Sequence, residues 1–211
     1  NDGAANPSWT AADIATSADG ANHVHVADMD GDGDLDIVSA SGEDSTIAWY
    51  ENDGEDDPSW TAANIATSAD HATNVQVADM DGDGDLDLYV GNEGFAAQLF
   101  RNEAGRFTDV AGEAGVDGAG VVKGTAWGDY DNDGDTDLFV SAVGADRLFR
   151  NDGDTFVDVT SSAGVAGADT DWGTSCGWLD YNNDGLLDLF VCNYVRWSKE
   201  VDLSQDFRLV G

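Results

Sequence analysis

The sequence of 211 residues predicts an all-β protein built from repeated four-stranded units. Three observations carry this prediction: a repeat of about fifty residues, short segments rich in Val, Ile, Thr, Trp and Tyr, and turn-forming residues between those segments. The length fits one large all-β domain or a short repeat array. A hydrophobic content of 41%, with 7 Trp and 8 Phe, is enough for a packed core.

The repeat is visible in segments that are nearly identical. SWTAADIATSAD from Ser8 returns as SWTAANIATSAD from Ser59, and VADMDGDGDLD from Val26 returns unchanged from Val77. Four acidic runs recur at spacings of 51, 50 and 51 residues, and their first acidic residues are Asp28, Asp79, Asp129 and Asp180. A turn that opens with Asn keeps the same period, at Asn1, Asn52, Asn102 and Asn151. An internal period of this length is typical of repeat architectures.

Each repeat unit reads as four short strands without a helical period. In the first unit we expect these strands near His23–Ala27, Asp36–Ser41, Thr46–Asn52 and Ser59–Thr67. The second strand is apolar on both faces in the later units, as in Leu138–Val140, so we expect neighbouring sheets to cover it on both sides. Four-stranded units of 40 to 50 residues that cover one another predict the blades of a β-propeller. A β-solenoid is the alternative, although its rungs are usually shorter.

The acidic runs share the form Asp-x-(Asp/Asn)-x-Asp-Gly-x-x-Asp. Alternate residues of a tight loop can direct their carboxylates at one centre, while the Gly permits the backbone to reverse and the seventh backbone carbonyl supplies a further oxygen. This all-oxygen set suits Ca²⁺ and lacks the His or Cys that zinc prefers. The runs therefore predict about four Ca²⁺ ions per chain, in loops 28–36, 79–87, 129–137 and 180–188.

The predicted ligands are the side chains at positions one, three, five and nine of each loop and the backbone carbonyl at position seven. They are Asp28, Asp30, Asp32, Asp34, Asp36, Asp79, Asp81, Asp83, Asp85, Asp87, Asp129, Asp131, Asp133, Asp135, Asp137, Asp180, Asn182, Asp184, Leu186 and Asp188.

The acidic runs have two other interpretations. An EF-hand needs Glu at the twelfth position and a helix on each side. The flanks here are predicted strands, and the twelfth residues are Ser39, Val90, Val140 and Val191. An EF-hand is thereby excluded. A solvated acidic turn that binds nothing is the other alternative, and it does not require carboxylates in the same register in four repeats.

The loop that joins two strands and recurs every fifty residues or so resembles the FG-GAP/VCBS repeat of integrin α-like β-propellers. TIAWYENDG from Thr46 is similar to the VCBS-type variant, whereas LFRNDGDTFVDVTSSAGV from Leu148 and WLDYNNDGLLDLFVCNYVRW from Trp178 are similar to bacterial relatives of cartilage acidic protein. The resemblance covers roughly residues 1–197. It implies Ca²⁺ between the first two strands of a blade, secretion, and a role in adhesion or in binding protein or carbohydrate.

The chain is predicted to form a single propeller region over residues 1–211, but it departs from the family pattern in three ways. Propellers of this kind commonly have about seven blades, whereas four acidic loops are present. Residues 194–211 depart from the repeat, and residues 1–16 read as an outer strand without a preceding blade. Either these ends complete one blade and close a four-bladed ring, or the chain belongs to a larger propeller or pairs its open strand edges with copies of itself.

The charge excludes several classes of function. With 43 Asp and Glu against 8 Lys and Arg, the formal net charge is -35, so we expect no nucleic-acid binding and a need for divalent counter-ions. No apolar run reaches 18 residues, so we expect no membrane insertion. The sequence predicts a secreted or cell-surface module that binds an extracellular protein or carbohydrate.

Two further functions stay open as alternatives. One is a structural subunit of an extracellular surface assembly or filament, and the other is a polysaccharide-active enzyme. No Lys or Arg precedes Arg101, which argues against the enzyme, and we predict no catalytic residues and no cofactor other than Ca²⁺. His23 and His25 alternate along one predicted strand, but no nucleophile lies at a motif spacing from them.

Two predictions concern residues outside the loops. Trp9, Trp60, Trp127 and Trp178 recur with the repeat, so we expect them to pack in the core or between units. Cys176 lies four residues before the first ligand of its loop and Cys192 four residues after the last. The two cysteines are therefore expected to form either a cross-strand disulfide or a pair of buried thiols.

Overall fold

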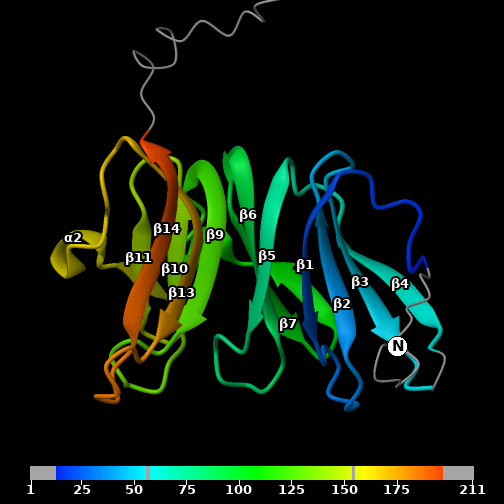
Figure 1. Ribbon diagram of the computed structural model, residues 1–211. Helices are drawn as coiled ribbons and strands as arrows, with labels where there is room; N and C mark the ends of the chain where they lie inside the picture. Colours follow the sequence, from blue (N-terminus) through cyan, green and yellow to red (C-terminus); the bar gives the residue numbers. More distant parts are fainter. Residues whose placement is uncertain (1–12, 56–57, 154, 197–211) are drawn as a thin grey trace, which may run out of the picture.

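The computed structural model describes residues 13–55, 58–153 and 155–196 (Figure 1). Within this part of the chain, no helix is long and apolar enough to cross a membrane. The expected outer strand over residues 1–16 and the tail beyond residue 196 lie largely outside the described residues. The described strands form four successive units, each called a blade below.

The strand bounds follow the repeat closely. The first blade contains β1 (Ala21–Ala27), β2 (Asp36–Ser41), β3 (Thr46–Asn52) and β4 (Trp60–Ala66). The second contains β5 (Ala72–Ala78), β6 (Asp87–Ala96), β7 (Gln98–Glu103) and β8 (Arg106–Asp109), followed by the helix α1 (Ala111–Ala114). The third contains β9 (Ala119–Gly128), β10 (Asp137–Ala142), β11 (Arg147–Asn151) and β12 (Phe156–Asp158), followed by α2 (Thr160–Ala163). The fourth contains β13 (Asp171–Leu179) and β14 (Asp188–Arg196). The four predicted strands of the first blade are confirmed.

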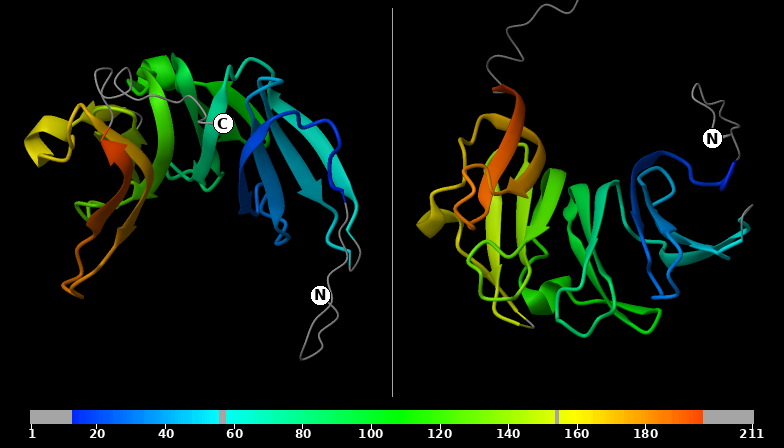
Figure 2. Two further views of the ribbon diagram at one scale, coloured as in Figure 1. Left: turned by 45° about the horizontal axis from the view of Figure 1, so that its top comes forward. Right: turned by 60° about the horizontal axis from the view of Figure 1, so that its bottom comes forward.

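Each blade is an antiparallel meander in which sequence neighbours pair. The first blade has the strand order β1-β2-β3-β4, and the register of its first pair places Val26 opposite Ile37. The second and third blades are joined because the end of β6, from Glu93 to Ala96, pairs with the start of β9. The inner strands β1, β5, β9 and β13 stand side by side, and the blades follow one another along an open arc (Figures 1 and 2). This arrangement confirms an all-β, propeller-like fold.

The hydrophobic core lies between the blades. One cluster of buried side chains joins the first and second blades and includes Met29, Val38 and Val75. A second cluster joins the second and third blades and includes Met80 and Tyr89. As predicted for a strand covered on both faces, Leu138, Phe139 and Val140 of β10 are all buried. Because each sheet buries its faces against its neighbours, no blade has a separate core of its own.

Two short helices were not predicted. Each is a single turn of four residues that follows the last strand of its blade. Each ends at a glycine in the left-handed region, Gly115 with φ 82° and Gly164 with φ 71°. A helix of one turn is too short to produce a hydrophobic period, so pattern analysis missed both.

Two of the four recurring tryptophans, Trp127 and Trp178, pack between blades, as predicted, whereas Trp60 is half-buried in the outer strand β4 and Trp9 lies outside the described residues. Trp127 of β9 meets Tyr89 of β6 edge-on, with ring centroids 6.3 Å apart. Trp178 of β13 meets Phe139 of β10 in the same way at 6.2 Å. These contacts lie at the same place in successive blade boundaries, so the boundary is part of the repeat.

Both cysteines are free thiols in the structure. The register of β13 and β14 places Cys176 opposite Val191, one position away from Cys192. Of the two alternatives, the disulfide is therefore not formed. Cys176 is half-buried, and burial raises the pKa of its thiol to about 11, whereas Cys192 is exposed rather than buried.

The boundary between blades predicts a contrast between two equivalent phenylalanines. Phe139 is 0% exposed, while Phe190, at the same position of the fourth blade, is 60% exposed. Replacing Phe139 with Ala should lower the free energy of unfolding by about 3–5 kcal/mol, because it leaves a cavity between blades. Phe190→Ala, measured at a protein concentration that keeps the chain monomeric, should cost less than about 1 kcal/mol. Chemical denaturation measures both, and equal losses would contradict the assignment of the core to the blade boundaries.

Candidate metal centres

The four acidic loops occupy equivalent places in the fold. Each connects the inner strand of its blade to the second strand: β1 to β2, β5 to β6, β9 to β10 and β13 to β14. In Figure 1 all four loops lie on the lower side of the molecule. The predicted location between the first two strands is therefore confirmed in all four blades.

The first Asp of each loop organises the loop backbone. Asp28 accepts hydrogen bonds from the N–H groups of Gly31 and Gly33, at 2.8 and 3.0 Å. Asp79 accepts the same two bonds in the second loop at 2.8 and 3.1 Å, and Asp129 and Asp180 each accept two from their own loops. The sixth residue must be Gly because its φ, 100° at Gly33, is one that other residues rarely adopt.

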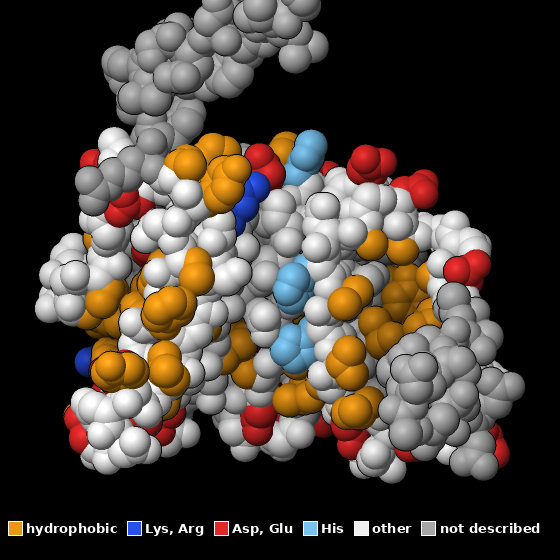
Figure 3. Space-filling model, in the orientation of Figure 1, with side chains coloured by type: hydrophobic (Ala, Val, Ile, Leu, Met, Phe, Trp, Pro, Cys, Tyr) orange, Lys and Arg blue, Asp and Glu red, His pale blue; other side chains and the backbone are white. Residues whose placement is uncertain are grey.

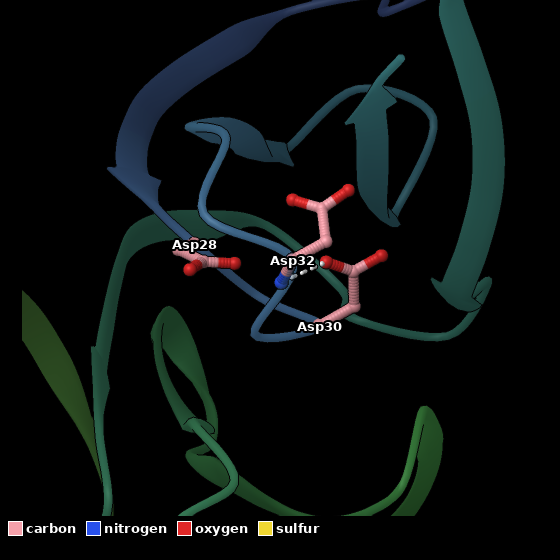
Figure 4. Close-up of side chains that lie close together, drawn as sticks. All are labelled: Asp28, Asp30 and Asp32. Atoms are coloured by element: carbon pink, nitrogen blue, oxygen red, sulfur yellow. Dashed lines mark hydrogen bonds between the residues drawn. The ribbon is translucent and has the colours of Figure 1, made fainter. Parts of the chain in front are cut away.

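Carboxylates gather in three of the four loops. One oxygen from each member of a group lies within 4.8 Å of the others, and the groups are Asp28, Asp30 and Asp32; Asp79, Asp81 and Asp87; and Asp129, Asp131 and Asp137. Figure 4 shows the first group on one turn of the loop, with the N–H of Asp32 donating to Asp30. These are the only such groups within the residues that the structure describes.

The ninth Asp of each of the first three loops is buried and links two distant segments. The exposed fraction of Asp36 is 1%, and those of Asp87 and Asp137 are 0%. One oxygen of Asp87 accepts the N–H of Met80 inside the loop at 2.9 Å, and the other accepts the N–H of Asn102 at 2.8 Å. The same pair of bonds recurs at Asp36 and Asp137. This carboxylate therefore ties the loop to the turn that follows the third strand.

The periodic turn Asn, for which the sequence predicts no role at the site, also belongs to it. Besides its N–H bond, Asn102 donates its side-chain Nδ2 to the carbonyl oxygen of Leu86 at 3.1 Å. Asn52 and Asn151 donate in the same way to the carbonyls of Leu35 and Thr136. The signal was present in the sequence, because the Asn keeps the same period as the acidic loop.

The seventh position uses its side chain away from the carboxylate group. Asp85 accepts the N–H of Ala104 at 2.7 Å, in the turn after β7. Asp34 approaches Gly54 in the corresponding turn so closely that a Cβ at Gly54 would clash with its carboxylate. Because the side chains of Asp85 and Asp34 face the turn, the backbone carbonyl of position seven stays the predicted ligand in these two loops.

The fourth loop differs in its donor set. It has Asn182 where the others have an Asp, and the Nδ2 of Asn182 donates to Asp184 at 3.0 Å. The backbone pattern of the first Asp is retained. Its predicted ligands Asp180, Asp184 and Asp188 do not form a group of three carboxylates like those of the other loops.

The electrostatics of the first three loops favour a divalent cation. Burial, which outweighs the two backbone hydrogen bonds, raises the pKa of Asp87 to about 7 and that of Asp137 to about 6. Burial and, after it, the neighbouring carboxylate of Asp83 raise the pKa of Asp81. Across the described part of the chain, no ion pair includes a carboxylate of these loops. The donors of each group are all oxygens, and they repel one another because no positive side chain lies among them. Such a group fits Ca²⁺, and Ca²⁺ binding would keep its three carboxylates ionised.

The two raised pKa values predict the pH dependence of the metal-free protein. The folded-state pKa values of Asp87 and Asp137 lie above the ordinary Asp value of 3.8, so the folded state holds protons that the unfolded state releases. The resulting stability is complete below about pH 4 and is lost as the pH rises through about 6 and 7. The melting temperature of metal-free protein should therefore rise when the pH is lowered from about 8 to about 5.

Asp87→Asn is the matched control, because it removes one titrating group and should flatten this dependence. The N–H of Met80 or Asn102 would lose its acceptor oxygen, so the variant is compared by its slope against pH and not by its absolute stability. A metal-free melting temperature that stays level or falls on acidification would show that these carboxylates are not strained by burial.

Two comparisons with known proteins found similarities to this chain. Among solved structures, a crystal structure of BBS1N in complex with ARL6DN, soaked with lead, is similar over 82% of this chain, with 12% sequence identity and a TM-score of 0.47. The match covers 53% of that chain, so the present chain spans about half of its length. A search of curated proteins found no match. The similarity to relatives of cartilage acidic protein stays a prediction.

The sequence profile of the FG-GAP-like repeat matches residues 28–90 and 129–191. Each matched segment begins at the first Asp of one acidic loop and runs through the next loop into the second strand of the following blade. The two segments together make up more than half of the chain, which thus belongs to the FG-GAP-like repeat family.

Proposed function

We propose that the chain is an extracellular ligand-binding module, stabilised by Ca²⁺, that mediates adhesion by binding a protein or carbohydrate. The observation that carries the proposal is the recurrence of one carboxylate group, at one place, in three successive blades. A repeated geometry of this kind is expected of structural ion sites, because each ion would hold the same turn of its blade. Extracellular calcium is abundant enough to occupy sites of moderate affinity.

The role of the metal in this proposal is structural. Asp87 would keep its bonds to Met80 and Asn102 while the ion neutralises the carboxylates beside it. Binding would thus favour the folded chain over the unfolded one and couple metal affinity to stability. With a formal net charge of -35, the chain also gains from any bound divalent cation that reduces self-repulsion.

The side of the molecule opposite the acidic loops supports the ligand-binding part of the proposal. Two hollows of about 550 Å³ each lie there, and Asp70 and Phe95 contribute to both. The ring of Phe95 is partly exposed and stacks on His71, with ring centroids 5.4 Å apart. An exposed aromatic ring flanked by carboxylates such as Glu43 is suited to stacking on a sugar ring or a cationic side chain.

We do not propose an enzyme. Cationic side chains are few, and two of the three ion pairs in the described residues hold an Arg next to an acidic residue two positions away. His23 and His25 lie on β1 beside residues of β5, and burial is the main cause of the lowered pKa of both. A structural subunit of an extracellular assembly stays the second candidate, favoured by the exposed apolar residues at the ends of the arc.

Calcium removal should destabilise the protein. We expect three to four calcium ions per chain by metal analysis, and a melting temperature lower by at least about 10 °C after chelation at neutral pH. Differential scanning calorimetry with excess calcium and with chelator measures the shift on the sample whose metal is counted. Little bound metal together with an unchanged melting curve would overturn the calcium proposal.

The third loop position offers matched variants for this experiment. Asp81→Asn converts the second loop to the donor set of the fourth, while Asn182→Asp does the reverse. The first change should weaken binding at one site by about tenfold or more, and the second should strengthen it at the fourth site. Calorimetric titration with calcium compares both variants with the wild type. Unchanged calcium binding in both variants would contradict the site assignment.

Ligand binding is tested on arrays of extracellular glycans and matrix proteins, probed with labelled protein in calcium and in chelator. We expect at least one class of glycan or protein to be bound in calcium only. Phe95→Ala should reduce that binding at least about tenfold, whereas Val157→Ala, a change at an exposed residue of the outer strand β12, should not. Binding that is unaffected by Phe95→Ala would show that the hollows beside Phe95 are not the ligand-binding site.

A further inference from the structure

Every boundary between neighbouring blades is built from the same positions. One blade contributes its trailing face, defined as the second residue of its acidic loop and the third residue of its second strand. These pairs are Met29 and Val38, Met80 and Tyr89, and Tyr130 and Phe139. The next blade contributes its leading face, defined as the residues four and two positions before its first loop Asp. These pairs are Val75 and Val77, Thr125 and Trp127, and Cys176 and Trp178.

The contacts across these boundaries are close. Met29, Val38 and Val75 belong to one buried cluster, with Val77 packed against it. At the last boundary Trp178 receives both trailing residues, because it stacks on Tyr130 at 6.0 Å and meets Phe139 edge-on at 6.2 Å. The strand residue of each trailing face is buried wherever a blade follows it: Val38, Tyr89 and Phe139 are no more than 2% exposed.

The two ends of the arc present the same positions without a neighbour among the described residues. The leading face of the first blade consists of Val24 and Val26, which are 56% and 52% exposed. The trailing face of the fourth blade consists of Tyr181 and Phe190, which are 80% and 60% exposed. Figure 3 shows the hydrophobic side chains gathered over β13 and β14 at one end and over β1 and β2 at the other.

We propose that a second copy of this chain docks its leading face on the trailing face of the first, so that the blade boundary continues from one copy to the next. The inference goes beyond the proposed function and does not depend on the identity of any ligand. Each end carries the half of the boundary that the other end lacks, so one contact uses two different surfaces. A contact of this head-to-tail kind forms a ring if the rotation closes and a filament if it does not.

The free cysteine of β14 defines how the copies align. Cys192 occupies the position that Ser141 has in the third blade. The Oγ of Ser141 donates a hydrogen bond to the carbonyl of Thr174 in the fourth blade at 3.0 Å, and it also forms a hydrogen bond with the thiol of Cys176. Cys176 in turn occupies the position of Val24. Docking as proposed therefore places Cys192 of one copy beside Val24 of the second copy.

Charge sets the conditions under which docking is observed. The copies repel each other because each has a formal net charge of -35, and none of the four terminal face residues is charged. Bound calcium and a salt concentration near the physiological value reduce this repulsion. The apolar contact would then decide whether the copies associate.

The test measures mass by light scattering in calcium and physiological salt. The wild type should have at least about twice the chain mass of 22.1 kDa. Phe190→Asp, which blocks the trailing face, and Val26→Asp, which blocks the leading face, should each be monomeric, because both positions are exposed and neither change should prevent folding. Mixed in equal amounts, the two variants should form a dimer, since each retains the face that the other has lost.

Three outcomes would overturn the proposal: a monomeric wild type, a Phe190→Asp variant that still assembles, or a mixture that stays monomeric. Melting curves in calcium and in chelator, recorded on the same variants, report the metal sites separately. A failure of docking with intact calcium stabilisation is thus distinguished from a failure of the proposed function.

A covalent cross-link tests the alignment. Oxidation of Val24→Cys should join the introduced thiol to Cys192 of another copy, with loss of two protons and two electrons to the added oxidant, and should give dimers or larger species on non-reducing gels. The double variant Val24→Cys/Cys192→Ser should not cross-link, whereas Val24→Cys/Cys176→Ser should. Cross-linking that persists without Cys192 would contradict the proposed docking geometry.

Discussion

The structure depends on a buried carboxylate in each of the first three blades, and no basic side chain of the described residues neutralises it. Asp87 is held by two backbone N–H groups, one from its own loop and one from the turn after the third strand. These bonds do not outweigh the loss of water, since its pKa is raised to about 7. A positive charge near this carboxylate would favour its ionised form in the folded protein, and no ion pair of the described residues supplies one.

This constraint explains why the loop, the second strand and the third-strand turn form one unit. The first Asp of the loop shapes the backbone, and the ninth Asp connects that backbone to the turn Asn. The turn Asn closes the arrangement by donating to the carbonyl just before the ninth Asp. An ion bound by the loop would thereby stabilise three segments of the blade, one of which, the turn, supplies none of its predicted ligands. Local ion binding would in this way be converted into stability of the whole sheet.

Much of this organisation was predictable because it is periodic. Alternating and apolar strand patterns located β1 to β4 to within two residues at each end, and the Asp positions located all four loops. The bond between Asp87 and Asn102 was not predictable, because nothing local relates two residues that meet only after the chain has crossed the sheet twice. The one-turn helices α1 and α2 were not predictable for a different reason, because four residues are too few to show a helical period of hydrophobic residues.

The blade boundaries explain how the sequence varies while the fold repeats. At the first boundary aliphatic residues meet, with Val38 in the same buried cluster as Val75, whereas at the last boundary Phe139 meets Trp178. The bulk of both faces therefore rises along the chain, and each pair of faces is matched in size. A leading face of two valines against a trailing face of Tyr181 and Phe190 has a combined bulk between those of the first and last boundaries. The two ends can consequently meet without more crowding than exists at the boundaries within the chain. In a repeat protein each unit is stabilised only by its nearest neighbours, so a further unit needs only a face of matching size.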